Sequence, residues 1–95
     1  MFNNPRYVTR GMLADIPLHL QIILWNMVDT MTIEPKDYLQ VFRLSNDNGA
    51  QKIVHTQEVP EYEKVLILKS GSPVTTKVFA IDDNDHSTML LASEY

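Results

Sequence analysis

Hydrophobic positions follow a helical spacing in one early stretch of this chain. Pro17 stands at its start, where the missing amide hydrogen of proline costs a helix nothing, and Asp15 just before it is a suitable N-cap. The residues that follow helical spacing are Leu20, Leu24, Met27, Val28 and Met31, and Ile23 and Trp25 widen the apolar stripe. Pro35 prevents the helix from continuing. The pattern therefore predicts one helix that begins after Asp15 and ends near Met31.

Runs of β-forming residues predict strands before and after this helix. The predicted strands are Arg6–Arg10, Tyr38–Leu44, Gln51–Gln57, Val65–Leu68, Lys77–Ile81 and Thr88–Ala92. Gly11 is expected to end the first strand. Asn48 and Gly49 tolerate the positive φ of a tight turn, so they predict a hairpin between the second and third strands. Pro60 ends the third strand, because proline cannot donate a hydrogen bond to its neighbour.

The order of these elements, β-α-β-β-β-β-β, indicates an α+β fold. We predict one N-terminal helix packed on a mostly antiparallel sheet of five to six strands. The chain has 95 residues and room for one hydrophobic core, so residues 1–95 are expected to form a single domain.

The residues that share a face of this sheet depend on the length of the first hairpin loop. With two or four loop residues, even positions before the turn share a face with odd positions after it. One face then carries Tyr38, Gln40, Phe42, Leu44, Gln51, Ile53, His55 and Gln57. A three-residue loop would scramble this pairing, and the sequence leaves both possibilities open.

The later strands are apolar at successive positions, as in Val65–Leu68, Val78–Ile81 and Met89–Ala92. Such runs are typical of strands that are buried on both sides. One helix of about 15 residues is only ~22 Å long and covers one face of roughly three strands. We therefore expect the other face to be sheltered by a second copy of the chain, by a partner protein, or by curling of the sheet on itself.

Composition argues against several classes of function. The 8 basic residues are scattered and balanced by acidic ones as far as Lys77, so nucleic-acid binding is not expected, and the net charge of −4 arises beyond that residue. The chain has no cysteine for a disulfide or a thiolate metal site. No apolar segment is long enough to span a membrane and no signal peptide is evident, which indicates a cytoplasmic location.

Polar residues among aromatic ones on the second and third strands form the main candidate site. Gln40, His55 and Gln57 fall on one face beside Tyr38, a pattern found in ligand sites and also on solvated sheet edges. His55 and Glu58 resemble an acid–base pair, but roughly 10 Å of extended chain separates them and they point to opposite sides. We interpret them as a strand residue and a turn residue rather than as catalytic groups.

The remaining polar clusters have structural explanations. Asp82, Asn84 and His86 alternate as at the start of a calcium-binding loop, but such a loop needs a glycine and a glutamate where this chain has Ser87 and Ser93. An Asp- and Asn-rich hairpin turn explains this segment. No histidine pair has the spacing of metal ligands and no glycine-rich loop could hold a phosphate, so neither a metal nor another cofactor is expected.

Four segments of the sequence, RYVTRG, IPLHLQIILW, DYLQVFRL and QKIVHTQEVPEY, resemble a family of small proteins of Gram-positive bacteria, domain of unknown function 960. The resemblance extends from Arg6 to about Tyr62 and weakens afterwards. It implies a single-domain cytoplasmic protein with no assigned activity, and no catalytic or ligand-binding residue follows from it.

Taken together, these features predict a non-enzymatic protein-interaction module that binds a partner protein or a second copy of itself. Trp25 and the apolar strand faces are the expected contact surface, with Pro60 and Tyr62 at its rim. The alternative is a small-ligand-binding domain with a site near Gln40, His55 and Gln57. No catalytic residue is predicted, and the candidate binding residues are Trp25, Tyr38, Gln40, His55, Gln57 and Tyr62.

Overall fold

The structure is a computed structural model that describes all 95 residues. Two helices, α1 (Arg10–Asp15) and α2 (Leu18–Asp29), follow the first strand. The strands are β1 (Arg6–Val8), β2 (Leu39–Asp47), β3 (Ala50–Gln57), β4 (Tyr62–Lys69), β5 (Thr76–Asp82) and β6 (Ser87–Leu91). One turn of 3-10 helix, η1 (Ala92–Glu94), follows β6.

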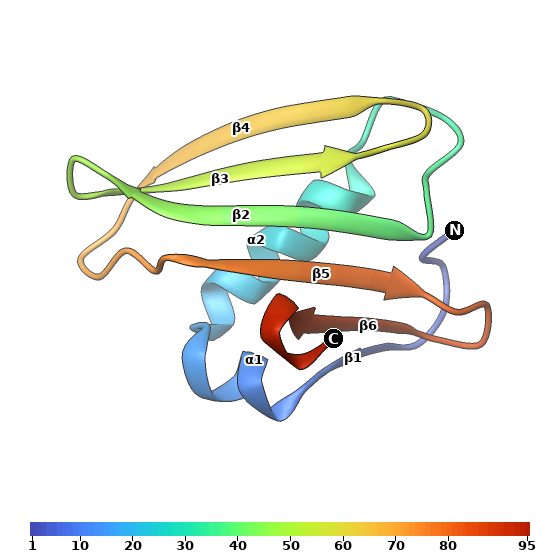
Figure 1. Cartoon of the computed structure of the whole chain (residues 1–95), viewed down its shortest axis with the longest axis horizontal. Helices are drawn as coiled ribbons and strands as arrows, with labels where there is room; N and C mark the ends of the chain where they lie inside the picture. Colours follow the sequence, from blue (N-terminus) through green and yellow to red (C-terminus); the bar gives the residue numbers. More distant parts are fainter.

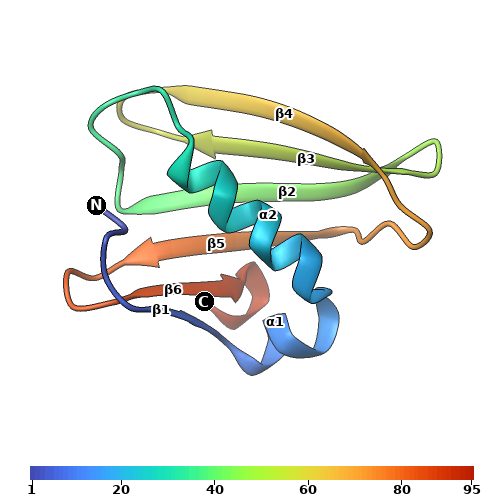
Figure 2. The same ribbon diagram turned by 180° about the vertical axis from the view of Figure 1, so that it is seen from behind.

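The six strands form one sheet in the order β1-β6-β5-β2-β3-β4. Neighbouring strands are antiparallel except β1 and β6, which run parallel. The long helix α2 crosses one side of this sheet diagonally; Figure 1 views the sheet from the opposite side and Figure 2 from the helix side. The predicted α+β arrangement of a helix on a mostly antiparallel sheet is confirmed, with one helix more than expected.

The extra helix changes the role of residues near the first turn. Thr9 caps α1, because its side-chain oxygen accepts a hydrogen bond from the amide of Met12. Asp15 is therefore the last residue of α1 and not the N-cap of the long helix, and Gly11 lies inside α1 instead of ending a strand. Pro17 separates the two helices, and α2 ends at Asp29, two residues before the predicted end.

The hairpin between β2 and β3 has the two-residue loop that the sequence favours. Asn48 and Gly49 have φ values of 52° and 89°, the left-handed conformation of both central residues in a type I′ turn. This loop sets the register in which Phe42 pairs with His55. The predicted sharing of faces by even positions on β2 and odd positions on β3 is confirmed.

The hydrophobic core lies between α2 and the sheet face that α2 covers. Its members are Phe2, Met12, Ile16, Leu20, Leu24, Met27, Val28, Phe42, Leu44, Ile53, Val78, Ala80, Met89 and Leu91. Full burial of one large apolar side chain stabilises a fold by roughly 1.5–3 kcal/mol. The buried apolar residues of α2 therefore hold this helix against the sheet, and they recur at the spacing that predicted it.

The N-terminal residues are tied to the turn between β5 and β6. The carboxylate of Asp82 accepts hydrogen bonds from the backbone amides of Phe2 and Asn84 and from the side chain of Asn4. Burial would raise the pKa of Asp82, but these hydrogen bonds outweigh it and lower the pKa below its usual value. The first carboxylate of the segment that resembles a calcium loop thus serves as an internal acceptor.

The prediction that the later strands are buried on both sides is wrong for β4. This strand lies at an edge of the sheet, and Val65 and Ile67 are 49% and 55% exposed. The prediction holds for the end of β6, where Met89, Leu90 and Leu91 are all buried. The last residues of the chain explain the difference, because η1 contacts β5 and Tyr95 meets the ring of Phe79, which pairs with Leu90. The inner strand β5 lies between these cases, with Phe79 and Ile81 only partly buried.

Candidate functional site

The predicted site residues Gln40, His55 and Gln57 lie together, but they are buried between the sheet and the elements that cover it. Their side chains are 0%, 0% and 4% exposed. The Nε2 atom of Gln40 donates hydrogen bonds to Oε1 of Gln57 at 2.7 Å and to the carbonyl oxygen of Asp37 at 2.9 Å. The Oε1 atom of Gln40 lies 2.7 Å from Nε2 of His55. The three side chains form one hydrogen-bonded chain.

His55 is enclosed by aromatic rings. Its imidazole stacks on Phe42, with 4.4 Å between the ring centroids, and meets the ring of Tyr62 edge-on at 5.3 Å. Burial, together with the charge of Lys64 on the neighbouring strand, lowers the pKa of His55 to about 4. The imidazole is therefore neutral at physiological pH, where it acts as a packed core residue.

Gln57 joins two loops to this cluster. Its Nε2 atom donates to the carbonyl oxygens of Pro35 and Pro60, and its Oε1 atom also accepts a hydrogen bond from the amide of Asp37. Every polar atom of the Gln40 and Gln57 side chains is thus engaged within the protein. The polar groups of these side chains therefore face the protein interior, and a small-ligand site near them stays a prediction.

The aromatic candidate residues lie on different parts of the molecule. Trp25 of α2 is half-buried, and the guanidinium group of Arg6 lies 4.7 Å from its ring centroid. Tyr38 is 54% exposed beside the start of β2. Tyr62 belongs to the buried cluster, and burial raises the pKa of its hydroxyl. Trp25 therefore lies apart from the other two, whereas Tyr38 and Tyr62 line one hollow of the surface together with Gln57. Glu58 is exposed in the turn after β3, so it does not pair with buried His55.

The side of the sheet that faces away from α2, here called the open face, carries the exposed apolar side chains of the strands. The strand registers place on it Leu39, Val41, Arg43, Lys52, Val54, Thr56, Glu63, Val65, Ile67, Lys77, Phe79, Ile81, Thr88 and Leu90. No helix crosses the middle of this face (Figure 1). It is the sheet face that was expected to be sheltered by a second copy, by a partner protein or by curling of the sheet.

Apolar side chains occupy the middle of the open face. Val41 pairs with Phe79, and Phe79 pairs with Leu90 on the next strand. On the other side of the sheet's midline, Val54 pairs with Val65. Most of these side chains are only partly buried, and Val65 is 49% exposed. These side chains form an apolar strip that is interrupted between β2 and β3, where Thr56 pairs with Val41 and Arg43 pairs with Val54. Exposed apolar surface of this kind is typical of an interaction site.

The two ends of the open face carry opposite charges. The half of the face toward the hairpin turn at Asn48-Gly49 carries the basic residues Arg43, Lys52, Lys69 and Lys77. Asp47 is the acidic residue in this half. At the other end, a hollow of about 400 Å³ is lined by Asp37, Tyr38, Leu39, Val41, Thr56, Gln57, Glu58, Glu61, Tyr62 and Glu63. The carboxylates among them make this end acidic.

This separation of charge was not predicted from the sequence. Acidic and basic residues are interspersed along the segment from β2 to β4, and the antiparallel pairing gathers each kind toward one end of the sheet. Only the sequence of β4 indicated the separation of charge. Glu61 and Glu63 lie at the start of this strand, and Lys69 is its last residue. When the neighbouring strands carry the same kind of charge at the same ends, the whole sheet has one acidic end and one basic end.

The structure contains no other cluster with obvious chemistry. No group of three His, Cys, Asp or Glu side chains is arranged to hold a metal ion. Neither helix is long and apolar enough to cross a membrane. His86 and Asp83 form an exposed pair within one turn, with 3.2 Å between Nε2 and the carboxylate.

Comparisons with known proteins identify relatives of this chain. The profile of a family described as a staphylococcal protein of unknown function, domain of unknown function 960, matches residues 5–94. A solved structure of a protein of unknown function from Enterococcus faecalis is similar over 98% of this chain and 92% of that one, with a TM-score of 0.83 and 27% sequence identity. No curated protein sequence matches the chain. The family match spans nearly every residue, so this chain belongs to the domain of unknown function 960 family.

Proposed function

We propose that this protein is a non-enzymatic interaction module that associates with a second copy of itself through the open face. The observation that carries the proposal is the set of partly exposed apolar side chains on that face, which runs from Phe79 and Val41 on the inner strands to Val65 and Ile67 on the edge strand β4, the last two 49% and 55% exposed. Stacked sheets bury such strips against one another at a separation of ~10 Å. The hydrophobic effect then favours association, because it removes apolar surface from water.

Charge supports a second copy as the occupant of the open face. Two sheets related by a twofold axis that lies between them and perpendicular to the strands place the acidic end of one over the basic end of the other. Glu61 and Glu63 of one subunit then approach the basic end of the other, where Lys52 of β3 and Lys69 of β4 lie. Complementary potentials of this kind fix the orientation of an interface and disfavour other partners. A single surface is self-complementary only with this twofold axis.

The size of the open face is sufficient for a stable dimer. The strands from β6 to β4 span about 24 Å at ~4.8 Å per strand, and eight residues of β3 extend about 26 Å. The flat footprint is therefore about 600 Å² per subunit, and a specific interface needs roughly 500 Å² per subunit or more. A partner of this chain's own size can cover the whole strip.

The position of the charges supports self-association over an extended peptide added at the sheet edge. The free edge strand β4 carries Glu63, Lys64 and Lys69, and charged side chains on edge strands oppose pairing with another strand. At the centre of the open face the exposed charged residue is Arg43, in the middle of β2. Stacking of faces therefore has to accommodate this one central position, whereas pairing of edges would bring the row of charges on β4 against a second strand.

Charge reversal tests the proposal and its orientation. We expect the unmodified chain to form a dimer whose stability decreases with salt, measured by light scattering and sedimentation over a range of protein concentrations. Glu61→Lys with Glu63→Lys cancels the net negative charge of the acidic end, where Asp37 and Glu58 remain, and Lys52→Glu with Lys77→Glu cancels the net positive charge of the basic end. Each pair of substitutions alone places like charges opposite one another across the interface and should yield a monomer. All of them together in one chain restore opposite charges between these four positions, and the dimer should return.

The matched control carries the same change in charge elsewhere. Asp15 and Glu34 are exposed residues outside the open face, and Asp15→Lys with Glu34→Lys changes the net charge as much as reversal of Glu61 and Glu63. This control should remain dimeric. A chain that is monomeric at every concentration, or a dimer that survives either reversal of the open face, contradicts the proposal.

A further inference from the structure

A second hollow lies on the helix side of the sheet, away from the open face. Because α2 crosses the sheet diagonally, it leaves a corner uncovered near the ends of β3 and β4 (Figure 2). This corner contains a pocket of about 790 Å³ lined by Pro17, His19, Leu20, Ile23, Gln51, Ile67, Leu68, Lys69, Ser70, Gly71, Ser72 and Val74. Pockets for small ligands usually have volumes of roughly 300–1,000 Å³.

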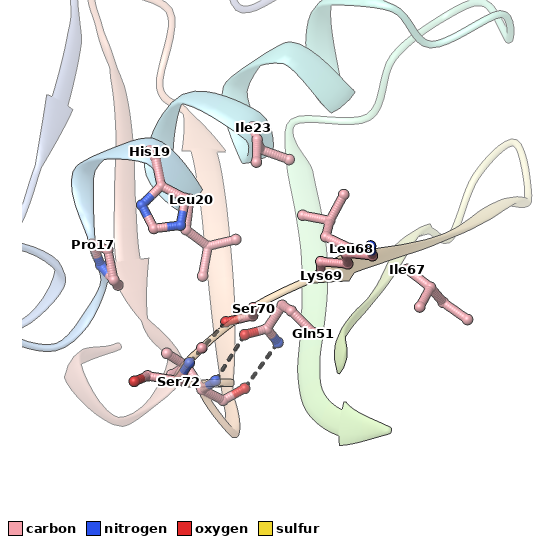
Figure 3. Close-up of a pocket in the computed structure, with 12 residues that line it drawn as sticks. Pro17, His19, Leu20, Ile23, Gln51, Ile67, Leu68, Lys69, Ser70 and Ser72 are labelled. Atoms are coloured by element: carbon pink, nitrogen blue, oxygen red, sulfur yellow. Dashed lines mark hydrogen bonds between the residues drawn. The ribbon is translucent and has the colours of Figure 1, made fainter. Parts of the chain in front are cut away.

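The inner part of the pocket is apolar. The side chains of Ile23 from α2 and Leu68 from β4 point toward one another across it, whereas that of Ile67 points away (Figure 3). Ile23, Leu68 and Val74 are each only half-buried, although all three pack against the core. Part of each of these apolar side chains packs against the core and part is exposed in the pocket. A hydrocarbon chain that binds there would remove the exposed apolar surface from water.

One wall of the pocket is held in place by Gln51. This side chain is 2% exposed, and it binds both backbone polar groups of Val74. Its Oε1 atom accepts from the Val74 amide at 2.7 Å, and its Nε2 atom donates to the Val74 carbonyl oxygen at 3.0 Å (Figure 3). The connection between β4 and β5 is thereby fixed to β3. The pocket is consequently formed before a ligand binds, which reduces the entropy lost on binding.

The charge of the lining is unusual for this chain. None of the lining residues is acidic, although the chain carries 12 acidic residues and has a net charge of −4. Lys69 borders the pocket, but its side chain belongs to the open face with that of Ile67, so the hydrogen-bond donors of the lining are the imidazole of His19 and the hydroxyls of Ser70 and Ser72. The lining thus repels an anion less than other parts of this surface do, and it offers hydrogen-bond donors.

We infer that this pocket binds a small amphipathic anion, a free medium-chain carboxylate whose hydrocarbon chain lies between Ile23 and Leu68. The carboxylate lies at the polar rim near Ser70 and Ser72, where donors are available and no side chain is acidic. Such a ligand matches the two halves of the pocket, one apolar and one polar. This site is independent of the association that we propose for the open face.

Binding of decanoate, kept below its micelle-forming concentration, tests the inference. Titration of isotope-labelled protein, followed by NMR, should shift the amide signals of residues 19–23 and 68–74 in a saturable manner. Decanol should bind more weakly because it lacks the charge. Decyltrimethylammonium should bind most weakly because its charge is reversed. Equal shifts for all three ligands, or shifts spread over the whole surface, would overturn the inference.

Two variants locate the site. Ile23→Trp fills the pocket and should weaken decanoate binding at least about tenfold, a change of about 1.4 kcal/mol. The adjacent Ile22 is 59% exposed and does not line the pocket, so Ile22→Trp is the matched control and should bind decanoate normally. Ser72→Glu, at an exposed rim position, should reverse the preference so that decyltrimethylammonium binds more tightly than decanoate.

The outcomes are separable from those of the dimer experiments. Thermal unfolding of Ile23→Trp shows whether this variant is folded, and Ser72→Glu provides a test that does not depend on it. Reversal of Glu61 and Glu63 should leave decanoate binding unchanged, because neither residue lines the pocket. If Ser72→Glu binds decanoate as the unmodified chain does, the carboxylate does not lie at this rim and the inference is wrong.

Discussion

The Nε2 atom of His55 lies 2.7 Å from Oε1 of Gln40, and this contact fixes the protonation state of the histidine. The amide nitrogen of Gln40 donates to Asp37 and Gln57, so its oxygen must be the atom that accepts from His55. The proton of the neutral imidazole therefore resides on Nε2. Its Nδ1 atom is buried without a hydrogen-bond partner, and a second proton there would be desolvated and unpaired.

This arrangement predicts a loss of stability in mild acid. The pKa of His55 is about 4 in the folded protein, and its ordinary value of 6.5 applies when the chain unfolds. Between these two pH values the unfolded state binds more protons than the folded state, so the free energy of unfolding decreases as the pH falls. The difference between the two pKa values corresponds to about 3 kcal/mol. That contribution is complete above pH 6.5 and lost below pH 4.

Urea denaturation at a series of pH values checks this prediction. His55→Gln removes the titrating group, so the free energy of unfolding of this variant should be lower at neutral pH but nearly constant between pH 6.5 and 5. The carboxylates of Asp29 and Asp82 have pKa values lowered by their hydrogen-bond partners, and they therefore affect stability mainly in stronger acid. Parallel losses in the variant and in the unmodified chain would show that His55 is not responsible.

Gln57 should be among the most sensitive polar residues of the protein. It is 4% exposed and forms hydrogen bonds with Pro35, Asp37, Gln40 and Pro60. Gln57→Leu leaves these partners without a hydrogen bond in a largely buried place, and each unsatisfied buried group costs about 1–3 kcal/mol. We expect a loss of about 3 kcal/mol, because relaxation and entry of water recover part of the sum.

Hydrogen exchange and urea denaturation together measure this effect. The amide of Asp37 should exchange much faster in Gln57→Leu, since its acceptor is the side-chain oxygen of Gln57. The neighbouring Thr56 is half-buried on the open face, so Thr56→Leu is the matched control, with an expected change below about 1 kcal/mol. A loss no greater in Gln57→Leu than in Thr56→Leu would mean that the loops do not depend on this amide.

Local patterns in the sequence were sufficient to predict the long helix and the hairpin. The spacing of Leu20, Leu24 and Val28 depends only on neighbouring turns of one helix, and the turn at Asn48-Gly49 needs only two residues with positive φ. The short helix α1 was missed because six residues are too few to show a period, and its start depends on the side chain of Thr9.

Features that depend on distant segments could not be predicted. The sequence pattern around Gln40 and Gln57 is the same for a buried hydrogen-bonded cluster and for a ligand site. The two cases are distinguished by the loops at Pro35 and Pro60, whose carbonyl oxygens accept hydrogen bonds from Gln57. The helix-side pocket brings Ile23 next to Leu68, residues that are far apart in the chain. Placement of β4 at the sheet edge likewise follows from strand order, which hydrophobic runs do not specify.

Glu94, near the C-terminus, contacts the backbone of Gly11, near the N-terminus. In this arrangement the Glu94 carboxylate occupies the space that a side chain at residue 11 would need. The carboxylate of Glu94 accepts hydrogen bonds from the amide of Gly11 at 3.2 Å, from the hydroxyl of Thr9 and from the amide of Leu91 at 2.9 Å. The hydrogen bond from Thr9 has the largest part in lowering the pKa of Glu94. A Cβ atom at residue 11 would lie 2.6 Å from this carboxylate.

The effect of Gly11→Ala on stability should therefore change sign with the residue at position 94. In the unmodified chain the alanine methyl group displaces the Glu94 carboxylate and breaks its hydrogen bonds, so the melting temperature should fall. In a Glu94→Ala background there is nothing to displace, and alanine is more favourable than glycine within a helix by up to about 1 kcal/mol. The same substitution should then raise the melting temperature. Circular dichroism of the four chains of this double-mutant cycle measures both changes. If Gly11→Ala shifts the melting temperature in the same direction in both backgrounds, the carboxylate of Glu94 does not occupy the space above Gly11.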